Sequence, residues 1–303
     1  MSNLSEVRRL RNMNKSAIVL HSLVLVFIVA YGTIKRQSLE KESNAVDKPY
    51  NCFLIADRLR YDAASDKVVQ SVQTTSIELD MLLLVCLFVG VTIVAHIIHY
   101  ARVSKIQATG TNYLRWIEYA VSASIMIVIL LILSTGRQSY LVLAVFVMTF
   151  VEMFQGYFIE KNIMQRDMSS AYLHVFLGWV LFAAAWTPVI GYLYDAAGAG
   201  RNNMSEANDS PDSLEHLIWI IFIFFALFGV VNLVHVWKAR KTHRQFQDAS
   251  VYKNVMKTYF LKYIEPAYIT LSFVSKTALV IWVASAVLIS PLTWIKFPSE
   301  LDA

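Results

Sequence analysis

One lysine lies where a lysine is costly. Lys276 stands inside the apolar stretch LSFVSKTALV, near the middle of the run 263–290. A lysine at the centre of a membrane helix costs about 2.5–3.5 kcal/mol on insertion scales, and this one is too far from either end of its run for its side chain to reach water. Two readings stay open from position alone. The amine either pairs with a carboxylate for structural reasons, or it is used chemically, since a desolvated amine is a competent nucleophile for an aldehyde.

Few carboxylates lie within apolar runs, and Glu118 is the best candidate partner. It follows Arg115 by one helical turn in RWIEYAVSAS, and Ser122 is one turn further along the same face. Ser272 lies one turn before the lysine. A carboxylate, two hydroxyls and an amine are therefore expected to converge inside a helical bundle. Glu152 is the alternative partner, and a polar pocket or a neighbouring helix is the other interpretation of its position.

The elements that must position these groups are membrane helices. The chain of 303 residues is 56% apolar and only 16% charged, with a mean hydropathy of +0.49. A soluble domain carries about a quarter charged residues, and a run of roughly 20 apolar residues spans a bilayer as a helix. The composition predicts an all-α polytopic membrane protein that forms one domain over residues 1–303 and has no nucleic-acid partner. Seven spans are expected near 17–34, 79–101, 113–134, 139–159, 171–195, 214–237 and 263–290.

The distribution of basic residues predicts the orientation. Lysine and arginine gather on the cytoplasmic side of membrane proteins. Most of the 27 in this chain fall on the side of the N-terminus, many of them in the predicted loop 238–262. The N-terminus is therefore expected in the cytoplasm and the C-terminus outside. The long first loop, 35–78, holds alternating pieces that predict a small external hairpin.

The chain resembles the heliorhodopsins over essentially its whole length. The resemblance rests on RWIEYAVSASIM, on SFVSKTALVIW with its lysine in the seventh helix, on the N-inside orientation and on the long first loop. It implies a seven-helix rhodopsin-like bundle that binds all-trans retinal. Lys276 would form the Schiff base, Glu118 would be its counterion, and Ser272 would lie beside the Schiff base. A hydrogen bond from Ser122 to Glu118 is our inference from spacing.

The resemblance also implies a polar cavity with histidines on helices one and two. His21 fits the first position. His96 and His99 both fit the second, and His96 is preferred because it lies deeper. The alternative is that they are hydrogen-bonded interior histidines with no role in proton transfer. Retinal needs a tight apolar slot, which helices three to six are expected to line with Met126, Gln155, Trp186 and Phe222.

Three functions compete. The first is a photoreceptor with a slow photocycle, read by a cytoplasmic partner or by anionic lipid at the loop 238–262. The second is a light-driven or light-gated proton transporter or channel, as in some viral members of the resembled family. The third is a transporter or a G-protein-coupled receptor without retinal, which conflicts with the N-inside orientation and the missing inverted repeats. None of them is an enzyme. The resemblance implies a homodimer, and the plasma membrane is the expected location.

Overall fold

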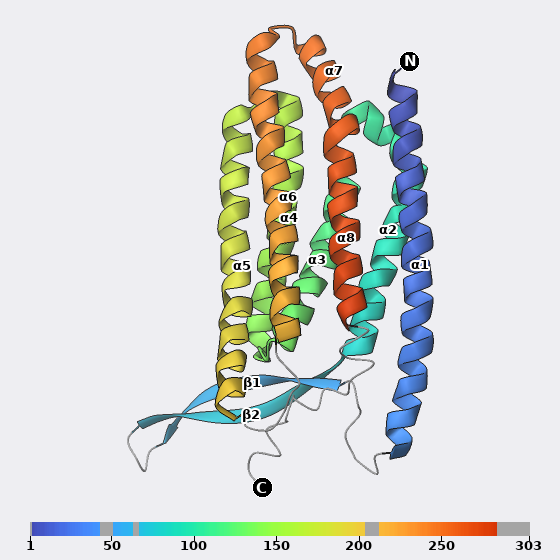
Figure 1. The fold of residues 1–303 in the computed structure, drawn as a ribbon. Helices are drawn as coiled ribbons and strands as arrows, with labels where there is room; N and C mark the ends of the chain where they lie inside the picture. Colours follow the sequence, from blue (N-terminus) through green and yellow to red (C-terminus); the bar gives the residue numbers. More distant parts are fainter. Residues whose placement is uncertain (1, 43–50, 63–66, 204–211, 284–303) are drawn as a thin grey trace.

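The protein is a bundle of membrane-spanning helices with a β-hairpin across one end (Figure 1). The computed structural model describes residues 2–42, 51–62, 67–203 and 212–283. Seven helices in this part of the chain are long and apolar enough to cross a membrane. The predicted rhodopsin-like seven-helix bundle is thereby confirmed. The end with the N-terminus and the α6–α7 turn is called the N-terminal end below, and the opposite end is called the hairpin end.

The helices are longer than the apolar runs that predict them, because helix continues into the polar segments outside the membrane. The last predicted run, 263–290, is described only as far as Val283. The elements are α1 (Ser2–Glu42), β1 (Asn51–Asp62), β2 (Lys67–Asp80), α2 (Met81–Thr109), α3 (Tyr113–Leu133), α4 (Ser139–Gln165), α5 (Met168–Asn203), α6 (Asp212–Gln245), α7 (Ala249–Tyr259), η1 (Phe260–Ile264) and α8 (Glu265–Val283).

Helix α3 is the centre of the bundle. Every residue from Ser122 to Leu133 is buried, and α2, α4 and α5 pack around the helix. A helix that is apolar on all sides must be enclosed by others, which explains this place in the fold. Asn112 caps the start of the helix, and its side chain accepts a hydrogen bond of 3.3 Å from the backbone N–H of Arg115.

The first long loop forms the predicted hairpin. Strands β1 and β2 pair antiparallel, from Asn51 opposite Asp80 to Asp62 opposite Lys67, with an irregularity between Leu54 and Ala56. The hairpin leads directly into α2, where Asp80 caps the helix by accepting from the backbone N–H of Leu83. Figure 1 shows it lying across the bundle at the end opposite the N-terminus.

The segment 238–262 is not a loop, so that prediction is wrong. Helix α6 continues to Gln245 and α7 begins at Ala249, which leaves a turn of three residues. Lysine, arginine and glutamine are good helix formers, so α6 extends past its apolar part. Asp248 caps α7, and hydrogen bonds from the hydroxyl and the backbone N–H of Ser250, both 2.7 Å, lower the pKa of its carboxyl.

Arg166 joins the end of α4 to the α6–α7 turn. It ends α4 in the left-handed conformation, at φ 66°. Its guanidinium donates to the carbonyls of Phe246 and Gln247 and to the ring of His243. It also lies 5.3 Å from the centre of the Tyr252 ring. The turn is therefore held against the bundle at the N-terminal end.

The seventh span contains a π-helical turn. The backbone N–H of Glu265 bonds the carbonyl of Phe260, five residues earlier. Pro266 follows at once, and proline cannot donate a backbone hydrogen bond. A π turn widens the helix locally and changes the direction of the side chains that follow. Glu265 consequently lies buried in the bundle interior.

Candidate functional site

The buried lysine is paired with the carboxylate expected from the sequence. The Nζ of Lys276 on α8 forms an ion pair with the Oε1 of Glu118 on α3, and both side chains are about 4% exposed. The hydroxyl of Ser122 donates to the same Oε1 at 2.9 Å. The structure therefore brings these three groups together, as the sequence predicted. Removing one partner of such a pair costs about 3–5 kcal/mol, because the other charge stays buried.

Aromatic rings and one further hydroxyl surround the pair. The lysine Nζ lies 5.3 Å from the centre of the Tyr119 ring and 6.0 Å from that of Phe88. Tyr119 donates its hydroxyl to the carbonyl of Tyr268 at 2.9 Å. The hydroxyl of Ser272 is buried near that of Tyr119 and makes no well-formed hydrogen bond to another described residue. The amine thus lies beside two aromatic rings, and the buried Ser272 hydroxyl is one helical turn before it on α8.

Three histidines cluster beside the ion pair. The rings of His21 and His96 stack at 5.8 Å, and the His99 ring meets His96 edge-on at 6.3 Å. The Nδ1 of His96 is 2.8 Å from the Oδ1 of Asn14. The Nε2 atoms of all three are buried, with no hydrogen-bond partner among the described residues. The structure brings both helix-two candidates together with His21, within electrostatic reach of Lys276.

A second buried charge cluster lies one helical turn closer to the N-terminal end. Arg115 pairs with Glu160 of α4 and with Glu265 of α8. Asn112 completes it, donating from its backbone N–H to Glu160 at 3.0 Å and from its side chain to Glu265 at 2.8 Å. The guanidinium also lies 4.3 Å from the centre of the Tyr268 ring. One cation therefore joins α3, α4 and the seventh span.

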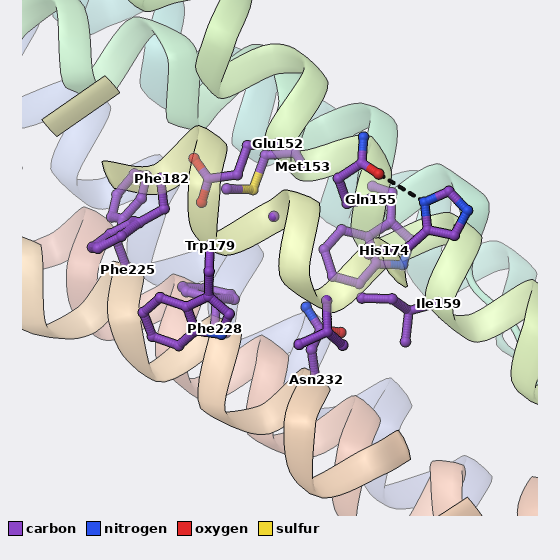
Figure 2. Close-up of a pocket in the computed structure, with 15 residues that line it drawn as sticks. Glu152, Met153, Gln155, Ile159, His174, Trp179, Phe182, Phe225, Phe228 and Asn232 are labelled. Carbon is purple, nitrogen blue, oxygen red and sulfur yellow. Dashed lines mark hydrogen bonds between the residues drawn. The ribbon is translucent and has the colours of Figure 1, made fainter. Parts of the chain in front are cut away.

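An aromatic pocket extends away from the ion pair between α4, α5 and α6. Figure 2 shows Phe182 and Phe225 at one end and His174, which is hydrogen-bonded to Gln155, at the other. The pocket is narrow, about 40 Å³. Phe228 lines it and meets the Tyr119 ring at 5.4 Å, which connects the pocket to the lysine.

Glycines let the rings of this pocket pack closely. A Cβ added at Gly156 on α4 would overlap the ring of Trp116. A Cβ at Gly229 on α6 would come within 2.8 Å of the Trp179 ring. Contacts this short force neighbouring side chains to move. The two glycines therefore make room for the indole rings of Trp116 and Trp179.

Of the other predicted lining residues, Trp186 and Met126 are buried and Phe222 is half-buried, and none of these three lines the pocket. Trp186 is 1% exposed and meets Phe222 edge-on at 5.2 Å. Met126 is buried on α3 two turns beyond Glu118. Glu152, the alternative lysine partner, lines the aromatic pocket instead, with its Oε2 buried and without a hydrogen bond to a described residue.

Comparison with known families identifies the arrangement. A family model described as Heliorhodopsin matches residues 10–288, nearly the whole chain. The chain belongs to the heliorhodopsin family. Membership implies a retinal chromophore, and the seven apolar helices make the protein an integral multi-pass membrane protein. No individual curated protein is significantly similar to it.

The residues of this heliorhodopsin fit retinal. The aldehyde needs an amine, which Lys276 supplies, and a bound cation needs a buried anion, which Glu118 supplies. The buried Ser272 hydroxyl, which lacks a well-formed partner among the described residues, offers a polar contact at that end. The aromatic pocket would take the apolar end of retinal between aromatic side chains. Side chains such as Trp179 must move apart there to admit a ligand larger than water.

Sequence reasoning missed the Arg115 cluster. Arg115 was used only for its spacing to Glu118, and neither Glu160 nor Glu265, which the structure pairs with it, was considered as its partner. The available signal was the pair Glu265–Pro266 at the start of the last apolar run. A carboxylate beside a proline within a membrane span requires a partner.

Proposed function

We propose that the protein is a light sensor in which Lys276 holds all-trans retinal and Glu118 balances the positive charge on its nitrogen. The observation that carries the proposal is the buried ion pair between α8 and α3, with Ser122 bound to the same carboxylate oxygen. No substrate is turned over, so the proposed role is not that of an enzyme.

Retinal, when bound, absorbs visible light and isomerises, which changes the position of its attachment relative to the protein. The remaining work belongs to side chains of the chain itself. Glu118 holds the negative charge in a fixed position, because Ser122 donates to it from one turn along α3. Phe88 and Tyr119 keep water from the lysine nitrogen. In such a site, a small displacement of the lysine changes its interaction with Glu118 strongly, since little water screens it.

The histidine cluster is the proposed destination of a proton released at the lysine nitrogen. The Nε2 atoms of His21 and His96 lack hydrogen-bond partners among the described residues and lie beside the ion pair. A neutral imidazole can accept a proton at its unprotonated ring nitrogen, which suits these side chains to this use. His96 is held by Asn14 through its other ring nitrogen, which leaves Nε2 as its open position.

Proton transport is the second candidate function, and the same histidines favour it. The path towards the hairpin end argues against it. From Ala120 to Leu133, α3 carries no titratable side chain, and Ser122 to Leu133 are all buried. A conducting path needs titratable or hydrated groups throughout the membrane. Apart from Glu152, the protonatable groups named here near the lysine lie towards the N-terminal end. This arrangement supports a proton that is transferred locally and then returned to the lysine nitrogen.

Photocurrent under voltage clamp separates the two functions. The sensor predicts a light-induced absorption change with no steady current at any imposed proton gradient. A light-dependent current that reverses with the proton gradient would show transport instead. The lysine variant K276A is the control, because it should show neither signal.

The surface that reads the light signal is proposed at the N-terminal end. The exposed basic residues Arg240, Lys241 and Arg244 of α6 lie next to the turn that Arg166 holds. A cytoplasmic partner with an acidic surface suits this charge. We further propose that the N-terminus is cytoplasmic, the C-terminus external, the membrane the plasma membrane and the assembly a homodimer.

A further inference from the structure

A groove runs between α1 and α8, away from the candidate site. It has a volume of about 590 Å³. Its wall at the N-terminal end is polar and basic, with Arg8, Arg9 and Asn12. Towards the middle of the membrane its wall is apolar, with Ala17 and Phe273. The groove is therefore amphipathic along its length.

The length of the groove matches the depth of one leaflet. From Ser5 to Leu20 a helix rises roughly 22 Å at about 1.5 Å per residue. Half of a bilayer's hydrocarbon core is about 15 Å. A groove of this length reaches from the headgroup region well into the hydrocarbon. Leu20 is 45% exposed and opens to the lipid side.

The charge at the headgroup end is positive. Arg8 and Arg9 are both exposed, and Arg9 has Glu6 at 3.9 Å as an ion-pair partner. An exposed pair at that distance contributes little, so its guanidinium is available to another anion. Arginine binds phosphate well because its planar group donates two parallel hydrogen bonds.

We propose that this groove binds one phospholipid with a net negative headgroup. The phosphate lies against Arg8 and Arg9, Asn12 donates to the headgroup, and an acyl chain follows Ala17 and Phe273. Basic pockets between helices beside a membrane surface select anionic lipids in this way. A peptide or a second copy of the chain would have to match both the basic end and the apolar end, which a phospholipid does by its own chemistry.

The bound acyl chain would also cover one side of the histidine cluster. The ring of Phe273 lies 5.3 Å from that of His21, between the groove and the cluster. The proposal is nevertheless independent of the function proposed above. Lipid binding is measured in the dark, on protein with or without retinal.

Native mass spectrometry of the full chain tests the site. The protein is released from detergent after incubation with phosphatidylglycerol or phosphatidylcholine of the same acyl chains. We expect wild type to retain one phosphatidylglycerol in preference to phosphatidylcholine by roughly thirtyfold, the ratio expected for two basic residues near a membrane surface. The variant R8Q/R9Q should lose that preference, and S16W, which keeps the charges but fills the groove, should lose the tightly bound lipid of either kind.

The controls separate this lipid from other occupants. R240Q/K241Q removes the same charge from the N-terminal end outside the groove and should keep the preference. Helical circular dichroism shows that each variant is folded. Equal retention of the two lipids by wild type, or an unchanged preference in R8Q/R9Q, overturns the proposal. So does competition by soluble glycerol phosphate at the lipid's own concentration, which would show a phosphate site, or a loss of dimer in S16W, which would show an interface between copies.

Discussion

The Lys276–Glu118 pair is an expensive feature for a merely structural role. A buried ion pair often stabilises a protein less than apolar residues of the same size would. Here the amine faces aromatic rings, while the carboxylate is fixed by Ser122. That asymmetry is what the proposed roles require, with the nitrogen as the reactive group and the carboxylate as the positioned anion. A chemical use explains the arrangement better than packing does.

The proposed counterion role of Glu118 predicts that it tunes the colour of the retinal-loaded protein. We expect Glu118→Gln to shift the visible absorption band strongly or to lose it at neutral pH, because the positive nitrogen then has no buried anion. Ser122→Ala is the matched control on the same face of α3. It removes one hydrogen bond to the carboxylate but keeps the charge, so its band should move much less. Absorption spectra of both variants after addition of retinal are the measurement, and an unchanged E118Q spectrum would remove the counterion assignment.

His96 is the residue at which proton movement should be visible. We expect His96→Ala to slow the light-induced loss of the proton at the lysine nitrogen by roughly tenfold or more, because positioned acid–base groups contribute at least about a hundredfold in rate and His21 remains. Flash photolysis of the retinal-loaded protein measures it. His174→Ala is the control, since His174 binds Gln155 at the far end of the pocket. Equal rates in H96A and wild type would assign the proton elsewhere, with His99 the next residue to test.

At the scale of elements, the ion pairs of Arg115 connect α3 to α4 and α8. Removing it leaves Glu160 and Glu265 buried without their cation. We expect Arg115→Ala to lower the free energy of unfolding by about 3–5 kcal/mol, which a thermal melt in detergent detects. Arg115→Lys should recover only part of that loss, because an ammonium cannot form the two-sided contact of a guanidinium.

The control for Arg115 lies on the same side of the bundle. Arg102 is exposed and donates to the hydroxyl of Tyr113 at 3.2 Å. Arg102→Ala removes the same charge from the surface and should change the stability by less than about 0.5 kcal/mol. Equal melting temperatures for the two alanine variants would contradict a fastening role for Arg115.

Comparison of the elements with the sequence shows which local patterns were sufficient to predict the fold and the site. The apolar runs predicted all seven spans, since a bilayer admits few alternatives to a helix. The helical extensions of α6 and α7 were missed because polarity, not helix propensity, was used to end the spans. The pair of Lys276 and Glu118 was predictable because few charged residues interrupt the apolar runs, and Ser122 was predictable from its one-turn spacing to Glu118. The contact of Arg115 with Glu160 and Glu265 was not, because Arg115 and Glu160 stand at the ends of their predicted spans and a π turn precedes Glu265.

At the scale of the whole molecule, the buried charge clusters lie on one side, with Glu152 of the aromatic pocket as an exception among the described residues. The lysine pair, the histidines and the Arg115 cluster all lie between the middle of the bundle and the N-terminal end. The outer half of α3 is apolar up to the hairpin end. We therefore expect the partner that responds to the light signal to bind at the N-terminal end. The basic residues predict that this end is cytoplasmic.

Labelling of intact cells tests that orientation. In a variant without Cys52 and Cys86, we expect a cysteine at Asp195, an exposed position near the hairpin end, to react with a membrane-impermeant maleimide. A cysteine at Ser169, exposed at the N-terminal end of α5, should react only after the cells are opened. The reverse pattern would show that the N-terminus lies outside.

The central claim is that retinal is attached to Lys276. The most direct measurement is the visible absorption spectrum of the purified protein after addition of all-trans retinal, for wild type and for Lys276→Ala side by side. The account predicts a visible band in wild type and none in the variant, with the helical circular dichroism of both intact. A colourless wild type, or a band of equal strength in the variant, would contradict it.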